Sequence, residues 1–327
     1  MTSPKISVIL PAYNEERYIA KAIKSVLNQS LSDFELIVVN DGSTDNTLGV
    51  INSFDDSRIR LIDQENMGPG ACRNNALKIA CGEYIMYLDG DDWYHPEALE
   101  TAYREITKND SDLTFYQMIN YDDKTGKVYE NDWFDLKTFD ESFENRVFGP
   151  DETPGSIFDL SVGVCQKIYR ASFLRKIDAQ FPEGIFFEDM PFFYYVYLKA
   201  ERISIIKRHL YYRRKHNASI THVVDAKFLD TVPAGQILMD IFIKNGWYDM
   251  YKFDLLAYKI NGPRFALRDI EENYKIPLYN LIKEDYCGIK LSKYYQDFLD
   301  NLGPIKKKFF LDIIASKNYQ DFIALNS

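Results

Sequence analysis

Four short apolar runs, each followed by a polar loop, constrain the fold of the first part of the chain. The runs are Ile6–Leu10, Phe34–Val39, Ile59–Ile62 and Tyr84–Leu88. Patterns typical of helices separate them, and this strand–helix–strand order favours parallel strands joined by right-handed crossovers. The sequence therefore predicts an α/β fold with a mainly parallel central sheet flanked by helices. The strand ends, expected at one ligand-binding edge of that sheet, are at Pro11, Asp41, Asp63 and Asp89.

The fourth run ends in three carboxylates, those of Asp89, Asp91 and Asp92. Carboxylates this close repel one another unless a cation lies between them. Mg²⁺ and Mn²⁺ favour carboxylate oxygens, and they usually bind a protein through one or two carboxylates together with substrate phosphates. The stretch therefore predicts a metal and phosphate site. The alternative is a solvated acidic turn before Pro96.

A second acidic pair, Glu188 and Asp189, stands among Phe186, Phe187 and Met190. Charged side chains are seldom buried without a partner, so carboxylates among aromatic residues suggest the wall of a cleft. The alternative is a cap on a helix expected over 190–200, because Asp is a favoured N-cap residue.

Two basic elements of the sequence, Arg73 and the run 207–219, are candidates to contact these acids or a phosphate group. Arg73 follows the glycine-rich loop 66–70, where it can pair with Asp89, reach a nucleotide, or lie on the surface. The basic run 207–219 is either a charged face or a flexible segment that covers a diphosphate. Within or just after that run, His216 or His222 can complete a metal site, and a structural role for both histidines is the alternative.

The composition excludes several classes of protein. The formal net charge is −10 and the pI is near 5.1, which argues against a nucleic-acid partner. No apolar run approaches the length of a membrane span, and Ile6–Leu10 is too short for a signal-peptide core. The four cysteines show no paired spacing, so we expect reduced, mostly buried thiols in a cytoplasmic protein.

The pattern of apolar and polar residues changes beyond the first hundred residues. We expect strands and loops over 107–160, with a variable surface insertion as the alternative, and helices over 161–175 and 190–200. From about residue 225 segments with helical spacing follow one another, with breaks at Asn245-Gly246, Asn261–Pro263 and Gly303-Pro304. These segments predict a separate helical C-terminal domain over 225–327; they are 226–243, 248–260, 264–273, 276–285, 291–301 and 305–315.

Five motifs in order resemble the inverting family 2 glycosyltransferases with the GT-A fold. They are Val8–Glu15, Val39–Asp45, Asn66–Asn74, Leu88–Asp92 and Glu188-Asp189. The resemblance covers residues 5 to about 222, and over Phe181–Leu198 it is closest to transferases of cell-surface polysaccharides and teichoic acids. The chain lacks the Gln-x-x-Arg-Trp signature of processive synthases. The resemblance implies a catalytic domain over 1–224, with a nucleotide-sugar-binding half over 1–110 and an acceptor-side half over 111–224.

The resemblance also implies roles for particular residues. Asp189, beside Glu188, is expected to be the general base, and Asp91 to bind Mn²⁺ or Mg²⁺ with His216 as a further candidate ligand. One base on one face then implies a single in-line displacement with inversion. The donor is expected to be a UDP-sugar, and the acceptor a glycan, a polymer or a lipid-linked molecule. Residues expected to contact the donor are Pro11, Ala12, Tyr13, Glu15, Asp41, Asn66, Arg73, Asp89, Asp91, Arg213 and Ser219.

Two other functions fit parts of the sequence. A nucleotidyltransferase would need a basic, glycine-rich loop after the first strand, where this chain has Pro11–Glu16. A non-catalytic, partner-binding protein would have no need of the two acidic clusters. The helical domain is expected to bind acceptor, to form homo-oligomers or to lie on the inner face of the membrane. For the amphipathic stretch Lys306–Leu311, ordinary core packing is the favoured interpretation.

Overall fold

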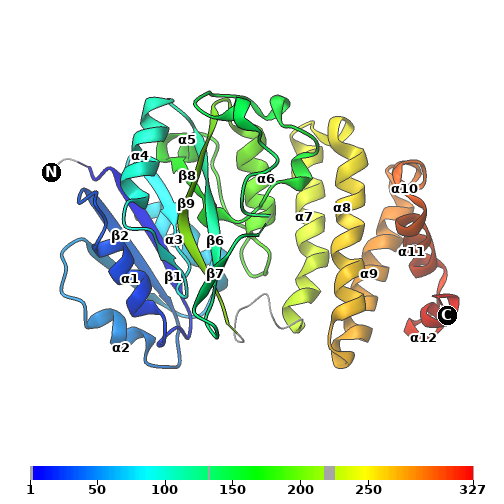
Figure 1. The fold of residues 1–327 in the computed structure, drawn as a ribbon. Coiled ribbons are helices and arrows are strands. Elements are labelled where there is room, and N and C mark those ends of the chain that lie inside the picture. The colour runs from blue at the N-terminus through cyan, green and yellow to red at the C-terminus, as the bar shows by residue number, and fades with distance from the viewer. Residues whose placement is uncertain (1–2, 132, 217–224, 327) are drawn as a thin grey trace. The chain divides into compact units, whose positions relative to one another are not determined.

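The structure is a computed structural model that describes residues 3–131, 133–216 and 225–326. The chain divides into two compact units (Figure 1). The first comprises Met1–Gly184 and Glu188–Asn217, and the second comprises Ile185–Phe187 and Ala218–Ser327. The division of the first unit into a donor half and an acceptor half stays a prediction.

The first unit contains the strands and the shorter helices. The strands are β1 Ile6–Ala12, β2 Phe34–Asp41, β3 Ile59–Gln64, β4 Tyr84–Tyr87, β5 Trp93–Tyr94, β6 Leu113–Asp122, β7 Lys127–Tyr129, β8 Lys167–Arg170 and β9 Ile203–Lys215. The α-helices are α1 Ile19–Leu27, α2 Thr47–Asn52, α3 Gly68–Ile79, α4 Ala98–Lys108, α5 Ala171–Lys176 and α6 Asp189–Lys199. The 3₁₀ turns are Glu141–Phe143, Pro150–Glu152, Ile157–Asp159 and Val164–Gln166.

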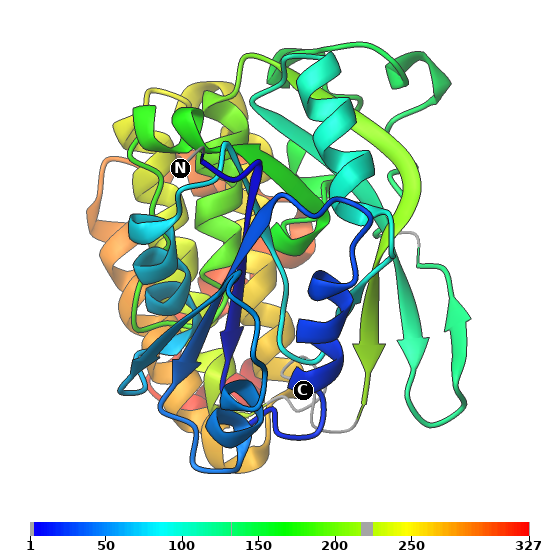
Figure 2. The ribbon, with the colours of Figure 1, turned by 90° about the vertical axis from the view of Figure 1, so that its left-hand side faces the viewer.

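All nine of these strands belong to one mixed sheet, in the order β3-β2-β1-β4-β8-β6-β9-β5, with β7 paired to β6. Strands β1 to β4 are parallel, as the sequence predicts, so their carboxyl ends share one edge. Strand β8 is antiparallel to both β4 and β6. Figure 2 shows the end of β6 between β9 and β7.

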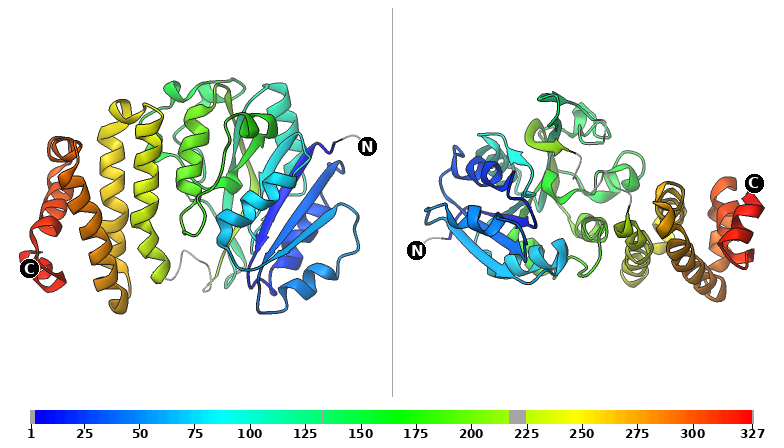
Figure 3. Two further views of the ribbon diagram at one scale, coloured as in Figure 1. Left: turned by 180° about the vertical axis from the view of Figure 1, so that it is seen from behind. Right: turned by 90° about the horizontal axis from the view of Figure 1, so that it is seen from below.

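Helices cover both faces of the parallel strands. Every residue of β2 and of β4 is buried, which explains why these segments read as continuous apolar runs. Right-handed crossovers place α1 and α3 on opposite faces, because the chain moves outward from β1 to β2 and returns from β3 to β4 (Figure 3). Helix α3, which lies against β1 and β2, carries Arg73.

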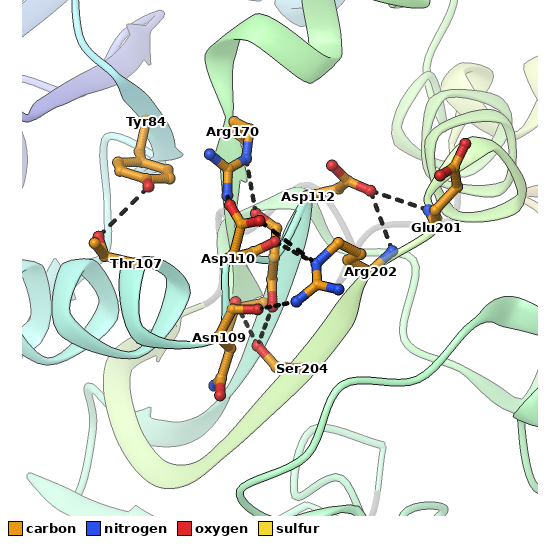
Figure 4. A network of polar contacts seen from close by, with 11 residues as sticks. Tyr84, Thr107, Asn109, Asp110, Asp112, Arg170, Glu201, Arg202 and Ser204 are labelled. Carbon is orange, nitrogen blue, oxygen red and sulfur yellow. Dashed lines mark hydrogen bonds and ion pairs between the residues drawn. The ribbon is translucent and has the colours of Figure 1, made fainter.

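A polar network fixes the register of β6, β8 and β9 at the end of the sheet where β6 and β9 begin (Figure 4). The Asp112 carboxylate accepts the backbone N–H groups of Glu201 and Arg202 at 3.0 and 3.1 Å. The Arg170 guanidinium donates to the Asp110 carboxylate at 2.6 Å and to the Ser111 carbonyl at 3.1 Å. This network positions the opposite ends of the same strands, where the site residues of β8 and β9 lie.

The second unit is helical. Its helices are α7 Thr231–Lys244, α8 Tyr248–Asp269, α9 Glu272–Leu291, α10 Tyr295–Asn301, α11 Pro304–Ala315 and α12 Tyr319–Asn326, preceded by the 3₁₀ turn Ala226–Asp230. Residues 185–187 belong to it, because the Phe186 N–H donates to Asp230 at 2.9 Å. In α11, Phe310 is fully buried and stacks on Phe298, so the apolar face of Lys306–Leu311 packs inside the unit.

Among the described residues, no helix has both the length and the apolar character needed to cross a bilayer. Association of the helical unit with a membrane or with a second copy of the chain stays a prediction. The four cysteines are free, with Cys72 and Cys165 buried and Cys81 exposed.

One local prediction was wrong. Residues 161–175 are not one helix, because Lys167–Arg170 pairs with β4 and β6, and a short apolar run does not distinguish a strand from a helix. Between β1 and α1, Asn14 has a φ of 56° and its side-chain oxygen accepts the Thr44 N–H, and α1 begins only at Ile19. The basic run is a strand as far as Lys215.

The predicted break at Asn261–Pro263 was also wrong. Helix α8 continues through Pro263, and α9 likewise continues through Pro277. Proline in a helix interior removes a hydrogen bond. Packing compensates in α8, because Ile260, Pro263 and Leu267 are buried at the spacing of one helix face.

Candidate active site

The buried guanidinium group of Arg73 brings the two predicted acidic clusters together. It donates one hydrogen bond to the Glu188 carboxylate and another to Asp89 at 3.0 Å. Arg73 comes from α3, Asp89 follows β4, and Glu188 immediately precedes α6. The side chains of Arg73 and Glu188 are only 7% and 8% exposed, whereas that of Asp89 is 43% exposed. The cluster is therefore closed on the Glu188 side and open on the Asp89 side.

A close approach between α3 and the loop before α6 makes this pairing possible. A Cβ atom at Gly70 would lie 2.2 Å from the Pro182 carbonyl oxygen, so this position requires glycine. One turn later, the Asn74 side chain accepts the Phe181 N–H at 2.9 Å and donates to the Phe181 carbonyl at 2.9 Å. These contacts fix the loop that presents Glu188 and Asp189.

Asp189 is the first residue of α6, and its side chain is half-buried. Burial, followed by the charge of Glu188, raises the pKa of Asp189 to about 7, while Arg73 acts in the opposite direction. A carboxyl group with a pKa near neutrality is suited to accept a proton. Glu188 stands at the N-cap position but makes no capping hydrogen bond, so capping does not explain it.

The sequence analysis did not identify Lys167, whose Nζ lies 4.5 Å from the ring centroid of Phe193 in α6. This lysine is completely buried, and its Nζ donates to the carbonyl oxygens of Ser161 at 2.8 Å and Gly163 at 2.7 Å. Burial lowers the pKa of Lys167 to about 7, and the charge of Asp189 opposes that change. Its position within a short strand gave no signal in the sequence.

Strand β9 holds the acidic turn in place. Asp92 is buried, and its carboxylate accepts the Tyr211 hydroxyl at 2.7 Å and the Arg214 N–H at 2.6 Å. The Arg214 side chain donates to the Asp91 carbonyl at 2.9 Å and forms an ion pair with Asp123. Asp92 therefore has a structural role, and Arg214 and Tyr211 are site residues that the sequence analysis missed.

Arg213, the predicted diphosphate ligand, takes a different position from Arg214. Its guanidinium group lies over the ring of Phe134, 5.2 Å from the ring centroid. The other predicted residues of this segment, Ser219 and the alternative metal ligand His222, lie outside the described residues. Neighbouring residues of a strand point to opposite faces, so Arg213 and Arg214 have different surroundings. The predicted contact of Arg213 with a diphosphate stays a prediction.

Asp91 and His216 are the candidate metal ligands that the structure brings together. Oδ2 of Asp91 lies 3.0 Å from Nε2 of His216, and the two side chains are 20% and 9% exposed. Within the described ranges, no group of three or more His, Cys, Asp or Glu residues forms a complete metal site. Hard cations often bind through one or two carboxylates and complete their coordination with phosphates and water. The oxygen and nitrogen donors of this pair fit such a shared ion.

The segment between β1 and α1 places Glu15 against the same turn. A Cβ atom at Gly90 would lie 3.0 Å from Glu15 Cγ, so Glu15 packs directly against the acidic turn. Burial, and then the charges of Asp91 and Asp89, raise the pKa of Glu15 to about 8. Nearby, Tyr13 is 48% exposed and Ala12 is buried. Pro11, the remaining predicted residue of this motif, is half-buried at the end of β1.

The Asp41 carboxylate accepts hydrogen bonds from residues in and beside the loop before α3. Its carboxylate accepts the N–H groups of Met67 and Gly68, each at 2.9 Å, and the Gln64 amide at 2.8 Å. Asp41 thereby holds the loop that leads into α3, in which Asn66 is exposed. Its predicted contact with a nucleotide stays a prediction.

Comparisons with known proteins bear on the family and the fold. A sequence model of glycosyl transferase family 2 matches residues 7–172. Glycosyltransferase GlyG of Streptococcus pneumoniae is 31% identical over 225 residues, which cover 67% of this chain and 73% of GlyG. The poly(ribitol-phosphate) β-N-acetylglucosaminyltransferase TarS of Staphylococcus aureus is 32% identical over 214 residues, which cover 64% of this chain.

Several of these relatives are much longer than the matched region. The match spans 35% of TarS, and it spans 33% of glycosyltransferase GlyA of Streptococcus pneumoniae, which is 30% identical over 70% of this chain. Among solved structures, residues 1–349 of TarS in complex with UDP-GlcNAc superpose with a TM-score of 0.68 and 22% identity. That superposition covers 98% of this chain and 90% of the other. It confirms the predicted GT-A fold with a helical C-terminal region.

Proposed function

The chain belongs to glycosyl transferase family 2, and from that premise we propose that it is an inverting glycosyltransferase. It transfers a sugar from a UDP-sugar to a hydroxyl group of a glycan, a polymer or a lipid-linked acceptor, with Asp189 as the general base. The observation that carries this proposal is the pair of bonds from Arg73 to Asp89 and Glu188. Through them, carboxylates a hundred residues apart in sequence converge beside Asp189.

The reaction requires one proton transfer and one substitution. The acceptor hydroxyl gives its proton to the Asp189 carboxylate as its oxygen attacks the anomeric carbon. The bond from that carbon to the diphosphate oxygen breaks, and UDP leaves with the electron pair. A well-placed base contributes roughly 10²- to 10⁴-fold to the rate of such a step. Attack from the side opposite the leaving group inverts the anomeric carbon.

Asp91 and His216 would hold a divalent cation, Mn²⁺ or Mg²⁺, against the diphosphate. Such an ion, when bound, neutralises the charge that develops on the leaving group. The contribution of the chain is to fix the two ligands: Arg214 bonds the Asp91 carbonyl, and Asp92 anchors the turn to β9. Asp89, with the most exposed carboxylate of the cluster, is the group that we assign to the sugar or the ribose.

The proposed donor is inferred from proteins that are similar to this chain. TarS has been crystallised with UDP-GlcNAc, and a TarS-type sequence is 32% identical to this chain. These facts support a UDP-sugar donor and leave its sugar open among neutral hexoses and N-acetylhexosamines.

The decisive experiment is donor turnover by the purified chain. We expect slow release of UDP from at least one of UDP-glucose, UDP-galactose, UDP-GlcNAc and UDP-GalNAc in the presence of Mn²⁺, with GDP-mannose as the matched control. UDP with Mn²⁺ should also raise the melting temperature, because a ligand that binds only the folded state stabilises it. Absence of both effects would reject the proposed enzyme in favour of a non-catalytic protein.

A further inference from the structure

A small cavity lies beside the helix that begins at Asp189. Its volume is about 250 Å³, and its lining includes Phe115, Trp133, Leu136, Phe139, Asp159 and Ser161. The 153–161 segment, which forms one wall, is held on α6. The ring of Phe158 packs on Tyr194 with centroids 4.8 Å apart, and the Thr153 hydroxyl bonds that of Tyr197 at 2.5 Å. One wall of the cavity therefore packs against α6, the helix that begins with the proposed base.

Lys167 links this cavity to α6. Its Nζ bonds the carbonyl oxygen of Ser161 at 2.8 Å and lies 4.8 Å from the ring centroid of Phe115, and both residues line the cavity. The same Nζ lies 4.5 Å from the ring centroid of Phe193 in α6, and its charge acts on Asp189. The cavity and the helix that begins at Asp189 therefore share contacts with Lys167.

The lining has the chemistry of a site for a sugar ring. Trp133 is 45% exposed and presents a broad apolar face, against which the C–H groups of a sugar can pack. The Asp159 carboxylate can accept hydrogen bonds from hydroxyl groups. Aromatic walls with a few polar groups are typical of small-molecule sites.

The charge around the cavity disfavours an anionic ligand. Residues 130–160 contain nine Asp or Glu and only two Lys or Arg. A second cavity of about 370 Å³ shares Leu136 and Phe139 with the first, and Glu130, Asp140 and Glu141 line it. The two lysines that line it pair with acids, Lys137 with Asp135 at 2.9 Å and Lys207 with Glu144 at 3.3 Å. Phosphate groups would meet like charge along this surface.

We propose that the cavity between Trp133 and Ser161, beside the helix that presents Asp189, binds a sugar unit of a neutral glycan acceptor. This inference rests on the proposed function and deepens it by naming the acceptor class. It sets the chain apart from relatives named for poly(ribitol-phosphate), an acceptor with a negative charge in every repeat.

The first test compares acceptors, using the UDP-sugar whose hydrolysis was detected. Cellobiose, lactose, chitobiose and maltotriose are the neutral probes, and poly(ribitol phosphate) is the anionic one. We expect at least one neutral probe to accelerate UDP release several-fold and to yield a glycosylated product by mass spectrometry. Faster transfer to poly(ribitol phosphate), or no transfer to any neutral probe while hydrolysis proceeds, would overturn the inference. Absence of both hydrolysis and stabilisation by UDP with Mn²⁺ would instead reject the proposed function.

The second test locates the acceptor site. Trp133→Ala should raise the acceptor KM about tenfold, the loss expected for a stacked ring, with a much smaller change in kcat. Tyr129→Ala is the matched control, because Tyr129 is equally exposed at 45% and does not line the cavity. Trp133→Phe should restore most of the affinity, which separates a lost ring from a folding defect. An unchanged KM in Trp133→Ala, or no rescue by phenylalanine, would contradict the assignment.

Discussion

Both units of the chain bury a cation against carboxylates, yet the two clusters differ in how they are completed. In the helical unit, the side chains of Lys259 and Asp285 are 2% and 7% exposed and form an ion pair at 2.9 Å. Gln236 adds a hydrogen bond to the same carboxylate at 3.0 Å. In the sheet unit, Arg73 bonds two carboxylates, of which Asp89 remains 43% exposed.

The difference shows what distinguishes a structural ion pair from a candidate site. A pair that is closed on all sides holds two helices in register and offers nothing to a ligand. A pair that leaves one carboxylate at the surface, next to an acid whose pKa is raised to about 7, has charge available for chemistry. Four experiments test this contrast.

The largest effect is expected at the cluster around Arg73, which is open on the Asp89 side. Asp189→Asn keeps the size of the side chain and removes its ability to accept a proton, so turnover should fall roughly 10²- to 10⁴-fold. UDP affinity, measured by calorimetry, should stay within about twofold, because the proposed base does not hold the nucleotide. Full activity in this variant would remove Asp189 from the mechanism.

At the closed pair, the expected effect is on stability alone. Lys259→Met leaves Asp285 buried without its cation and should cost about 3 kcal/mol in the free energy of unfolding, measured in urea. Replacing both residues, as Lys259→Met with Asp285→Leu, should recover most of that loss. UDP release under native conditions should not change in either variant, and a selective loss of activity would mean that the closed pair is not purely structural.

A smaller effect is expected for the candidate metal ligand. Asp91→Ala should weaken UDP binding about tenfold when Mn²⁺ is present, equal to about 1.4 kcal/mol. In chelator, the variant and the parent should bind UDP alike. Asp151→Ala, which removes an exposed carboxylate far along the chain, is the control for net charge. An equal loss with and without the metal would assign Asp91 to direct nucleotide contact.

The smallest effect concerns pH. Because Asp189 acts only when deprotonated, kcat/KM should rise with pH through a midpoint near the pKa of about 7 and be lost below it. Lys167→Met removes a positive charge that lowers the pKa of Asp189, so the midpoint should move to higher pH. A profile that is flat from about pH 5.5 to about pH 8 would contradict the raised pKa.

The parallel half of the fold followed from the sequence because β1, β2 and β4 are buried on both faces, whereas the edge strand β3 is partly exposed. Such strands, β2 above all, read as unbroken apolar runs, and the topology then fixes which ends share an edge. From the sequence, Asp89 and Glu188 are joined only as motifs of one resemblance. The resemblance supplied the association, and the structure supplied the connecting guanidinium group of Arg73.

The errors arose where tertiary contacts outweigh local pattern. Lys167–Arg170 is a strand because two neighbours pair with it, which local periodicity does not encode. Pro263 is tolerated because its helix face is buried. Trp133 and Asp159 lie in 107–160, where the sequence predicted strands and loops or a variable surface insertion, and nothing in that stretch indicates that these residues line one cavity.

Gly70 carries a consequence for any attempt to redesign this protein. With only 2.2 Å between a hypothetical methyl carbon and the Pro182 carbonyl oxygen, even alanine would act as a wedge between α3 and the loop leading to α6. The same hypothetical carbon would also lie 3.4 Å from Glu188 Cγ, so displacement of the loop would draw the Glu188 carboxylate away from its cation. The alignment of the two acidic clusters thus depends on a missing methyl group, at a position that carries no charge and takes no part in the chemistry.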